Sequence, residues 1–251
     1  MTAIALATRG LSKKFGALAV TQDVRFELPA GARHALIGPN GAGKTTFINL
    51  LTGMLAPDAG TIELDGKPIT RLPPQARVKR GLARTFQINT LFPDLTPLEA
   101  VTLAVCERRG ISRQWLRPLA SRRAAIEEAA TLLSQLGLGG ESRQPTRQLA
   151  YGHQRVLEIA LALATRPHVL LLDEPAAGVP AQESGILYEV ISALPAAIAV
   201  LFIEHDMDLV FRFASRITVL VSGRILREGP PAEIAEDPEV RAVYLGTAVH
   251  A

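Results

Sequence analysis

The feature that most constrains this chain is the segment Gly38–Thr45, which reads GPNGAGKT. It fits the pattern G-x-x-x-x-G-K-[ST] at every fixed position, a match that chance gives in about one chain of this length in a hundred. A short apolar run, Ala35–Gly38, precedes it and a helical pattern, Thr45–Met54, follows it, as the motif requires. Glycines let backbone N–H groups point at phosphate oxygens, and Lys44 adds a positive charge. The segment Gly38–Thr45, called the phosphate loop below, therefore predicts a binding site for the β- and γ-phosphates of a nucleotide, with the Thr45 hydroxyl beside Mg²⁺.

The composition favours a buried sheet and argues against a membrane span. Hydrophobic residues make up 48% of the 251 residues, a surplus that a parallel sheet buried on both faces would use. The longest apolar run, Ala196–Ile203, has eight residues, whereas roughly 20 are needed to cross a bilayer. No secretion signal is expected at Met1–Arg9. The single cysteine, Cys106, is expected to fill a helix interior, with a reactive thiol as the alternative.

Periodic patterns divide the single domain, 1–251, into a core and an insertion. Residues 1–88 and 165–251 alternate strand and helix patterns, which indicates a parallel sheet between helices with an antiparallel β part. Residues 89–164 carry helical patterns and are expected to form an inserted helical subdomain. Its first helix should begin at Thr96, where Thr-Pro-Leu-Glu supplies a capping box and a first-turn proline. The strands expected in the core are Ile4–Phe15, Val24–Leu28, the hairpin Thr61–Ile69, Leu82–Phe86, Val169–Leu172, Ala197–Ile203, Ile217–Val221 and Ile225–Glu228; the later helices are Ser121–Leu136, one from near Gly152, Ala181–Leu194 and Asp206–Phe213.

Two acids at the end of an apolar strand pattern indicate hydrolysis. In phosphate-loop ATPases the first, here Asp173, holds Mg²⁺ through its water shell, and the second, Glu174, orients and deprotonates the attacking water. Gln87, just after another strand, is placed to reach the Mg²⁺ and the water from the side. His205, one strand beyond the acids, is placed to contact the γ-phosphate. Each of these residues taken alone is also typical of an ordinary strand end.

Taken in order, these motifs resemble the nucleotide-binding subunits of ABC transporters over essentially the whole chain. Leu149–His153, at a helix start, completes the set as an anion-binding segment. More narrowly, the chain is similar to the ATP-binding subunits of the branched-chain amino acid importer family. Six stretches carry that similarity: Gly81–Gln87, Leu149–Gly152, Leu157–Ala160, Asp173–Gly178, Ile203–Met207 and Val243–Gly246.

The resemblance implies a P-loop NTPase (RecA-like) core and an ATPase that powers solute uptake through a separate transmembrane permease. It implies a dimer that encloses two ATP molecules, each between one protomer's phosphate loop and the other's Leu149–His153 segment. The helical subdomain and the region after Gln87 should dock onto the permease at the cytoplasmic face of the inner membrane. A periplasmic or extracellular solute-binding protein is expected in the same system.

The same resemblance assigns the site residues. Catalytic roles are expected for Lys44, Gln87, Glu174 and His205, and Mg²⁺ contacts for Thr45, Gln87 and Asp173. ATP is expected to contact Phe15 (stacked on adenine), Gly38, Pro39, Asn40, Gly41, Ala42, Gly43, Lys44, Thr45 and Thr46, and across the dimer Leu149, Ala150, Tyr151, Gly152 and His153.

Four positions depart from the usual cassette pattern. Ala150 and Tyr151 occupy the positions where most cassettes have Ser and Gly. Ala150 has no hydroxyl to donate to the γ-phosphate, so backbone N–H groups must bind it instead. His153 occupies the position of the usual glutamine. Pro180 falls where an aspartate or asparagine is usual, and proline removes a backbone N–H. In the family the loop that contains this position crosses the dimer interface, so the resemblance implies that the change bears on communication between the two ATP sites.

Several alternatives stay open at the level of sequence. Branched-chain amino acids are the default substrate, with other amino acids, urea or small organic acids as alternatives, and the partner cassette is either a second copy or a paralogue. The rival functions are a soluble ABC ATPase acting on nucleic acid or ribosomes and a nucleotide switch without turnover.

An arginine cluster around Trp115 is either a solvated helix face or a phosphate-binding surface. Its members are Arg108, Arg109, Arg113, Arg117, Arg122 and Arg123.

Overall fold

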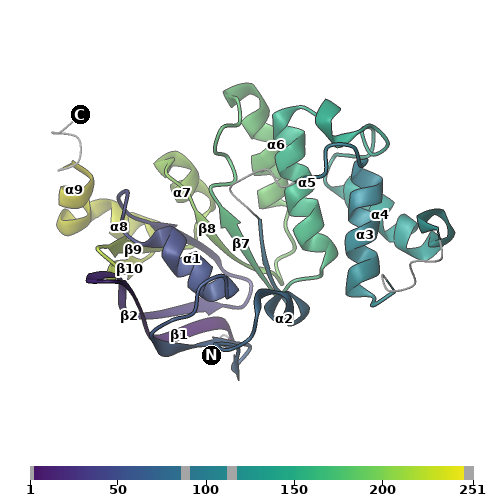
Figure 1. Cartoon of the computed structure of the whole chain (residues 1–251). Coiled ribbons are helices and arrows are strands. Elements are labelled where there is room, and N and C mark those ends of the chain that lie inside the picture. The colour runs from purple at the N-terminus through teal and green to yellow at the C-terminus, as the bar shows by residue number, and fades with distance from the viewer. Residues whose placement is uncertain (1–2, 86–90, 112–117, 246–251) are drawn as a thin grey trace. The chain divides into compact units, whose positions relative to one another are not determined.

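The computed structural model of the chain describes residues 3–85, 91–111 and 118–245, except the side chains at 181, 182, 184, 244 and 245. Backbone contacts divide it into two compact units (Figure 1). The core unit comprises Met1–Arg84, His168–Glu174 and Pro195–Ala251; the helical unit comprises Thr85–Pro167 and Pro175–Leu194. The sequence assigned all of 165–251 to the core, whereas the contacts group Pro175–Leu194 with the helices.

The core unit begins with a four-stranded antiparallel sheet in the order β2-β1-β4-β5. Its strands are β1 (Ile4–Phe15), β2 (Leu18–Pro29), β4 (Ala59–Leu64) and β5 (Lys67–Pro68). β2 begins before the predicted Val24. The predicted hairpin is present: Asp65 and Gly66, with φ of 49° and 71°, turn the chain between β4 and β5.

A six-stranded sheet follows in the order β10-β9-β3-β8-β7-β6. Its strands are β3 (Arg33–Ile37), β6 (Leu82–Arg84), β7 (Val169–Asp173), β8 (Ala199–Ile203), β9 (Arg216–Val221) and β10 (Arg224–Gly229). All neighbours are parallel except β9 and β10. Every residue of β7 and β8 is buried, which is why these strands read as unbroken apolar runs. The predicted α/β sheet is confirmed, and it places the ends of β3 and β7, with their functional residues, at one edge.

Helix α1 (Lys44–Thr52) lies between the two sheets (Figure 1). Its buried Phe47 and Leu51 belong to one apolar core with Phe26 of β2, Leu171 of β7 and Ile203 of β8. The Phe26 and Phe47 rings meet edge to face, 5.7 Å apart. Burying each such side chain stabilises the fold by about 1.5–3 kcal/mol. The helix that begins at the phosphate loop is therefore fixed by its packing.

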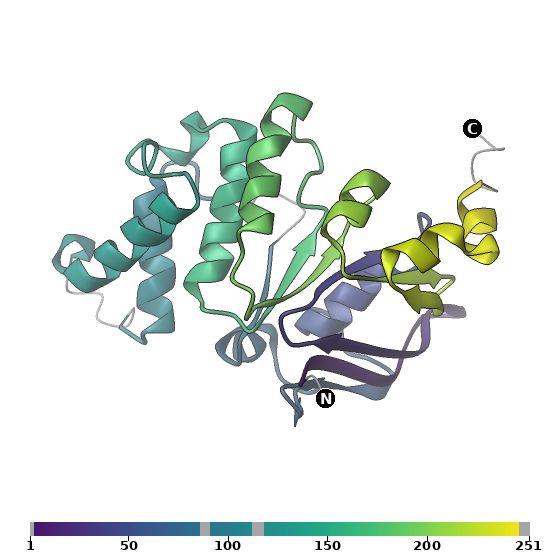
Figure 2. The ribbon, with the colours of Figure 1, turned by 180° about the vertical axis from the view of Figure 1, so that it is seen from behind.

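Further short helices complete the core unit. They are α2 (Pro74–Lys79), α7 (Met207–Phe213), α8 (Pro231–Glu236) and α9 (Pro238–Leu245). The Asp206 carboxylate accepts hydrogen bonds from the first N–H groups of α7. At the C-terminal end, α8 contacts β9, β10 and α9 (Figure 2). The sequence patterns did not predict α2, α8 or α9, each of which spans eight residues or fewer.

The helical unit contains α3 (Pro97–Arg108), α4 (Arg123–Gln135), α5 (Tyr151–Ala164) and α6 (Ala181–Ser192), with 3₁₀ turns at Leu119–Ser121 and Thr146–Gln148. The capping box predicted at Thr96 is present, and it uses both Thr96–Glu99 hydrogen bonds. α6 packs on α5, which explains its place in this unit. Among the described residues, no helix combines the length and apolar character that crossing a membrane requires.

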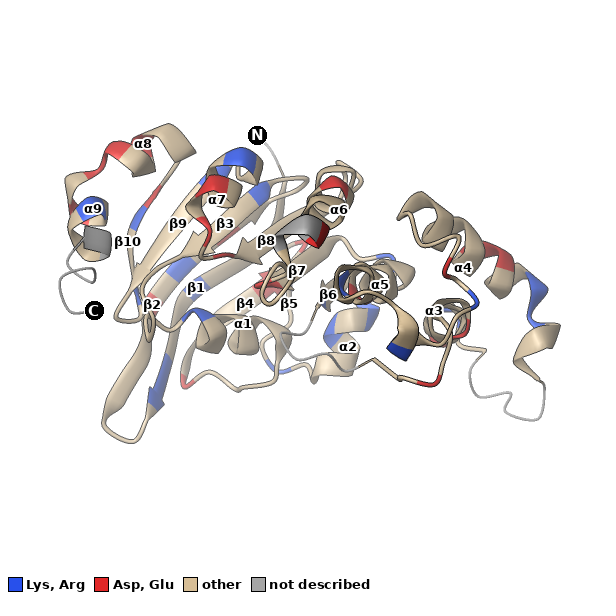
Figure 3. Cartoon of the chain, turned by 90° about the horizontal axis from the view of Figure 1, so that it is seen from above, with Lys and Arg blue, Asp and Glu red and all other residues tan. Residues whose placement is uncertain are grey.

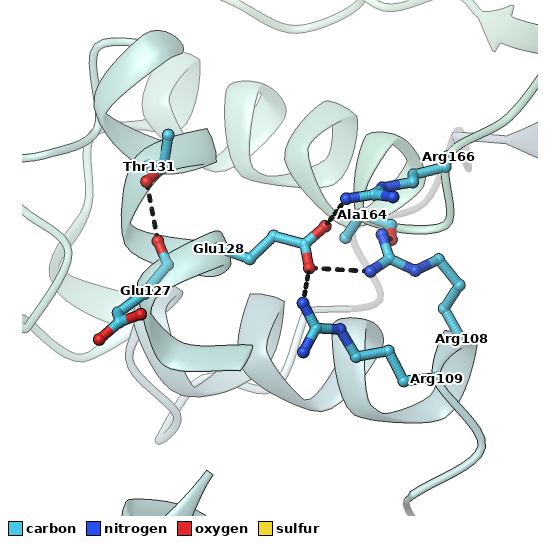
Figure 4. Close-up of polar contacts among 7 residues, drawn as sticks. All are labelled: Arg108, Arg109, Glu127, Glu128, Thr131, Ala164 and Arg166. Atoms are coloured by element: carbon cyan, nitrogen blue, oxygen red, sulfur yellow. Dashed lines mark hydrogen bonds and ion pairs between the residues drawn. The ribbon is translucent and has the colours of Figure 1, made fainter. Parts of the chain in front are cut away.

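Part of the arginine cluster is built into this unit. Both signs of charge lie on α4 (Figure 3), and its Glu128 is the centre of an ion-pair group (Figure 4). The Glu128 carboxylate lies 2.9 Å from Arg108, 2.6 Å from Arg109 and 2.7 Å from Arg166. The pKa of Glu128 is lowered to about 2, first by the hydrogen bond from Arg108 and then by the one from Arg109. Arg108 also donates to the Ala164 carbonyl at the end of α5, so these arginines join α3, α4 and α5.

Candidate active site

The phosphate loop depends on glycine for its close packing. At Gly43, which precedes α1 with a φ of 101°, an added Cβ would lie 2.5 Å from the Val20 carbonyl oxygen. At Gly38 a Cβ would lie 2.1 Å from the carbonyl oxygen of Leu220. Any side chain here would push the loop away from β2 or β9. Because Gly43 has no side chain to cap α1, the first N–H groups of this helix are left for a ligand.

The side chain of Lys44 is hydrogen-bonded to the backbone of the phosphate loop. Its ammonium donates hydrogen bonds to the carbonyl oxygens of Gly38 at 2.7 Å and Pro39 at 3.1 Å. Burial lowers the pKa of Lys44, and the charges of Glu174 and Asp173 act in the opposite direction. A cation at the base of the loop, with two carboxylates near enough to influence it, suits a nucleotide polyphosphate with its metal ion.

The end of β7 brings together three of the predicted residues. Asp173 pairs in register with Ile203 of β8, and the Glu174 N–H donates to the Ile203 carbonyl at 3.1 Å. Glu174 has a φ of 49°, a conformation that strains a residue other than glycine and that clusters at functional sites. The imidazole Nε2 of His205 lies 2.8 Å from Glu174 Oε1. The strand end thus presents Glu174 in a fixed orientation, in contact with His205.

Asp173 has a partner that the motif analysis did not assign. Arg84, the last residue of β6, donates from Nη2 to Asp173 Oδ2 at 2.6 Å and from Nη1 to Asn49 Oδ1 at 2.6 Å. Arg84 lies in the stretch that carries the family resemblance, but nothing in that stretch indicates that it faces Asp173. The sheet order decides this, because β6 and β7 are neighbours.

The residues fit a metal ion that arrives with a nucleotide. Among the described residues, no three His, Cys, Asp or Glu side chains gather into a metal-binding group. Mg²⁺ keeps several waters and is usually bound by one or two carboxylates together with substrate phosphates. Asp173 and the exposed Thr45 at the start of α1 would be the protein's contribution to such a site.

The Leu149–His153 segment belongs to the helical unit, where it forms the start of α5. The N–H of Gly152 donates to Glu183 Oε2 of α6 at 2.7 Å, so a carboxylate already lies at this helix start. The guanidinium of Arg155 donates to the Tyr151 hydroxyl at 2.8 Å and lies over its ring. Glu183 was not predicted, because sequence spacing does not show that it meets Gly152.

The remaining predicted residues are placed as follows. Phe15 is exposed, with 48% of its surface accessible, and the Lys13 ammonium lies 5.8 Å from its ring centre. An exposed ring at this position is compatible with stacking on a base. Gln87 lies outside the described residues, as does Trp115 with its neighbours Arg113 and Arg117. Cys106 is buried on α3, as expected of a helix-interior residue.

Known proteins resemble this chain over nearly its whole length. The profile of the ABC transporter family matches residues 21–177, and that of the branched-chain amino acid ATP-binding cassette transporters matches residues 224–250. The chain is 42% identical over 250 residues to the high-affinity branched-chain amino acid transport ATP-binding protein LivG of Salmonella typhimurium, covering 97% of this chain and 98% of LivG. It is 39% identical over 252 residues to the protein of the same description, BraF, of Pseudomonas aeruginosa, covering 97% and 98%. A crystal structure of an ABC transporter's ATP-binding cassette in its ADP conformation superimposes with a TM-score of 0.85, at 29% identity, covering 97% of this chain and 99% of that one.

Proposed function

This chain belongs to the ABC transporter family as an ATP-hydrolysing subunit, and on that premise we propose that it powers the uptake of branched-chain or related amino acids. The proposal for the substrate is supported by the C-terminal match at 224–250 and by the similarity to LivG and BraF, which are branched-chain amino acid transport ATP-binding proteins. The nucleic-acid and ribosome alternative has no comparable support.

In the proposed reaction, Lys44 and the N–H groups at the start of α1 bind the β- and γ-phosphates of ATP. Mg²⁺, when bound at Thr45 and Asp173, supplies positive charge to the phosphate oxygens. Glu174 accepts a proton from the water that attacks the γ-phosphorus, and the bond to the β,γ-bridging oxygen breaks. His205 holds the Glu174 carboxylate through the 2.8 Å contact with its Nε2. That contact is the single observation that carries the hydrolytic role of Glu174.

The assembly is proposed on the same basis. Two cassettes enclose two ATP molecules, and the start of α5 in each contacts the nucleotide held by the other. A separate permease and a solute-binding protein complete the importer, with this subunit at the cytoplasmic face of the membrane. In this assembly the partner's ATP would contact the segment Leu149–His153. The contacts would come from the backbone at Leu149, Ala150 and His153, from the His153 side chain, and from Tyr151 and Gly152.

Transport by the assembled importer tests this proposal. The tagged chain, co-expressed with candidate permease subunits, would be purified with the permease that it binds and reconstituted into vesicles containing Mg-ATP. Leucine, isoleucine and valine are expected to enter in the presence of the solute-binding protein, with ribose and glutamate as matched controls. Uptake of ribose or glutamate alone would overturn the substrate proposal and leave the ATPase assignment intact. The reconstituted importer with Glu174→Gln should, even with ATP, show no more uptake than the background that is measured when ATP is left out.

A further inference from the structure

Arg84 connects the predicted metal-holding carboxylate to the helix that follows the phosphate loop. Its guanidinium donates one hydrogen bond to Asp173 at the end of β7 and another to Asn49 in α1, each of 2.6 Å. The Asp173 side chain is 1% exposed and that of Arg84 is 11% exposed. Both groups are therefore shielded from water, where an ion pair is strongly coupled.

The backbone explains why Arg84 reaches this position. β6 runs parallel to β7, and Arg84 pairs with Leu171, two residues before Asp173. The long arginine side chain spans that interval. Asn49 lies in the same helix as Lys44, whose ammonium touches the phosphate loop. One guanidinium therefore links the acid at the strand end to the helix that carries the phosphate-binding lysine.

The geometry of arginine suits this task. Its planar guanidinium is always charged and presents donors in a fixed fork, which holds two acceptors in a defined relation. Arg84 engages Oδ2 of Asp173 and so restricts the rotation of that carboxylate. A lysine would supply the charge without the fixed second donor arm. The arrangement both compensates the buried charge of Asp173 and orients the carboxylate.

We propose that Arg84 is a positioning residue for Asp173, which it holds in the orientation that binds the Mg²⁺ of the nucleotide. This inference rests on the proposed role of Asp173 in holding that ion. Residues that orient a metal-binding side chain are typically worth about 10- to 100-fold in metal affinity. The Arg84–Asp173 pair also maintains the core unit without metal, because a buried carboxylate that loses its counter-charge destabilises the fold.

The first test is a double-mutant cycle on the full chain in EDTA, with melting temperature as the readout. Arg84→Met should lower the melting temperature by on the order of 10 °C, whereas the exposed Arg80→Met is the matched control and should change it little. In the Asp173→Asn background, the fall caused by Arg84→Met should shrink to less than half. Equal falls in both backgrounds would mean that Arg84 contributes only its packing and its hydrogen bond to Asn49, and would overturn the inference. If Arg84→Met alone gives no folded protein, recovery of folding in Arg84→Met/Asp173→Asn is the expected sign of the coupling, and failure of both variants to fold would count against it.

The second test measures the binding of a fluorescent ATP analogue as Mg²⁺ is titrated. In Arg84→Lys, affinity in EDTA should stay near that of the wild type, because the phosphate loop is intact. The Mg²⁺ concentration for half-maximal enhancement of binding should rise about 10- to 100-fold. An unchanged Mg²⁺ requirement would overturn the positioning role. If Asp173→Asn itself leaves the requirement unchanged, the proposed metal role of Asp173 fails instead, and the cycle above shows whether the Arg84–Asp173 coupling stands without it.

Discussion

Two helix starts in this protein are expected to bind phosphate, and they are built differently. At the start of α1, the chain itself supplies the cradle: close-packed glycines, the N–H groups of a helix start that no side chain caps, and the Lys44 ammonium within one continuous segment. At the start of α5, the segment contains no lysine or arginine before Arg155, and Gly152 already donates to the carboxylate of Glu183.

The difference shows why one motif is easier to recognise than the other. The phosphate loop needs particular residues at particular spacings, because backbone conformation and charge must coincide within a few residues. The α5 start has a conformation that Ala150 and Tyr151 tolerate, and its environment comes from α6 and from Arg155. The first site is therefore local, whereas the second depends on contacts between distant parts of the chain.

Loss of Lys44 should have the largest effect, because the local site depends on it most. We expect Lys44→Ala to lower ATP affinity at least about a hundredfold, since each hydrogen bond to a charged group is worth about 1.5–3 kcal/mol, and to abolish turnover. Isothermal titration with Mg-ATP measures this. The exposed Lys67→Ala is the control and should bind normally. Unchanged affinity in Lys44→Ala would refute the assignment of the loop.

Glu174→Gln should separate turnover from binding at the same site. The amide cannot accept the proton of the attacking water, so hydrolysis should fall by about 10²- to 10⁴-fold, roughly 3 to 5 kcal/mol of barrier. Mg-ATP should still bind, and an ATP-bound dimer should accumulate in size-exclusion chromatography. Asp173→Asn, by contrast, should weaken the Mg²⁺ dependence of binding. More than about a tenth of the wild-type rate in Glu174→Gln would exclude Glu174 as the general base, and His205 would be tested next.

A negative charge at the start of α5 should lower turnover without changing nucleotide binding at the start of α1. Tyr151→Asp would place a carboxylate where the partner's triphosphate is expected, so steady-state hydrolysis should fall below about a tenth of wild type because like charges repel. ATP binding by the monomer should be unchanged, since the phosphate loop is intact. Tyr151→Phe keeps the ring, loses only the hydroxyl that Arg155 contacts, and should retain most turnover. Normal turnover of Tyr151→Asp would show that this segment does not close over nucleotide.

The smallest effect is expected for Glu183→Gln, which removes a charge from the α5 start but keeps an acceptor for Gly152. A carboxylate near a helix N-terminus is worth about 0.3–1 kcal/mol, so the melting temperature should fall by about 1–4 °C. The exposed Glu189→Gln in the last turn of α6 is the matched control and should cause no fall. If both variants melt alike, the Glu183 carboxylate does not stabilise this helix start, and the two starts differ less than their contacts indicate.

Much of the fold could be predicted because its signals are local. The apolar runs of β7 and β8, the Asp65–Gly66 turn and the Thr96 capping box each depend on neighbouring residues, and all are present. The short helices α2 and α8 lacked such a signal. The grouping of α6 with the helical unit also escaped prediction, because it depends on packing against α5 and not on the pattern of α6 itself.

For the site, the sequence by itself supplied the groups on which the proposed chemistry depends: the Gly38–Thr45 segment with Lys44, and the acids Asp173 and Glu174 in succession. Only the tertiary structure decided which partners those groups have. His205 meets Glu174, Arg84 meets Asp173 and Asn49, and Glu183 meets Gly152. A motif encodes conformation and charge within a few residues, so it can be read along the chain. Contacts between distant residues are fixed by strand order and helix packing, because these bring together side chains that no spacing in the sequence relates.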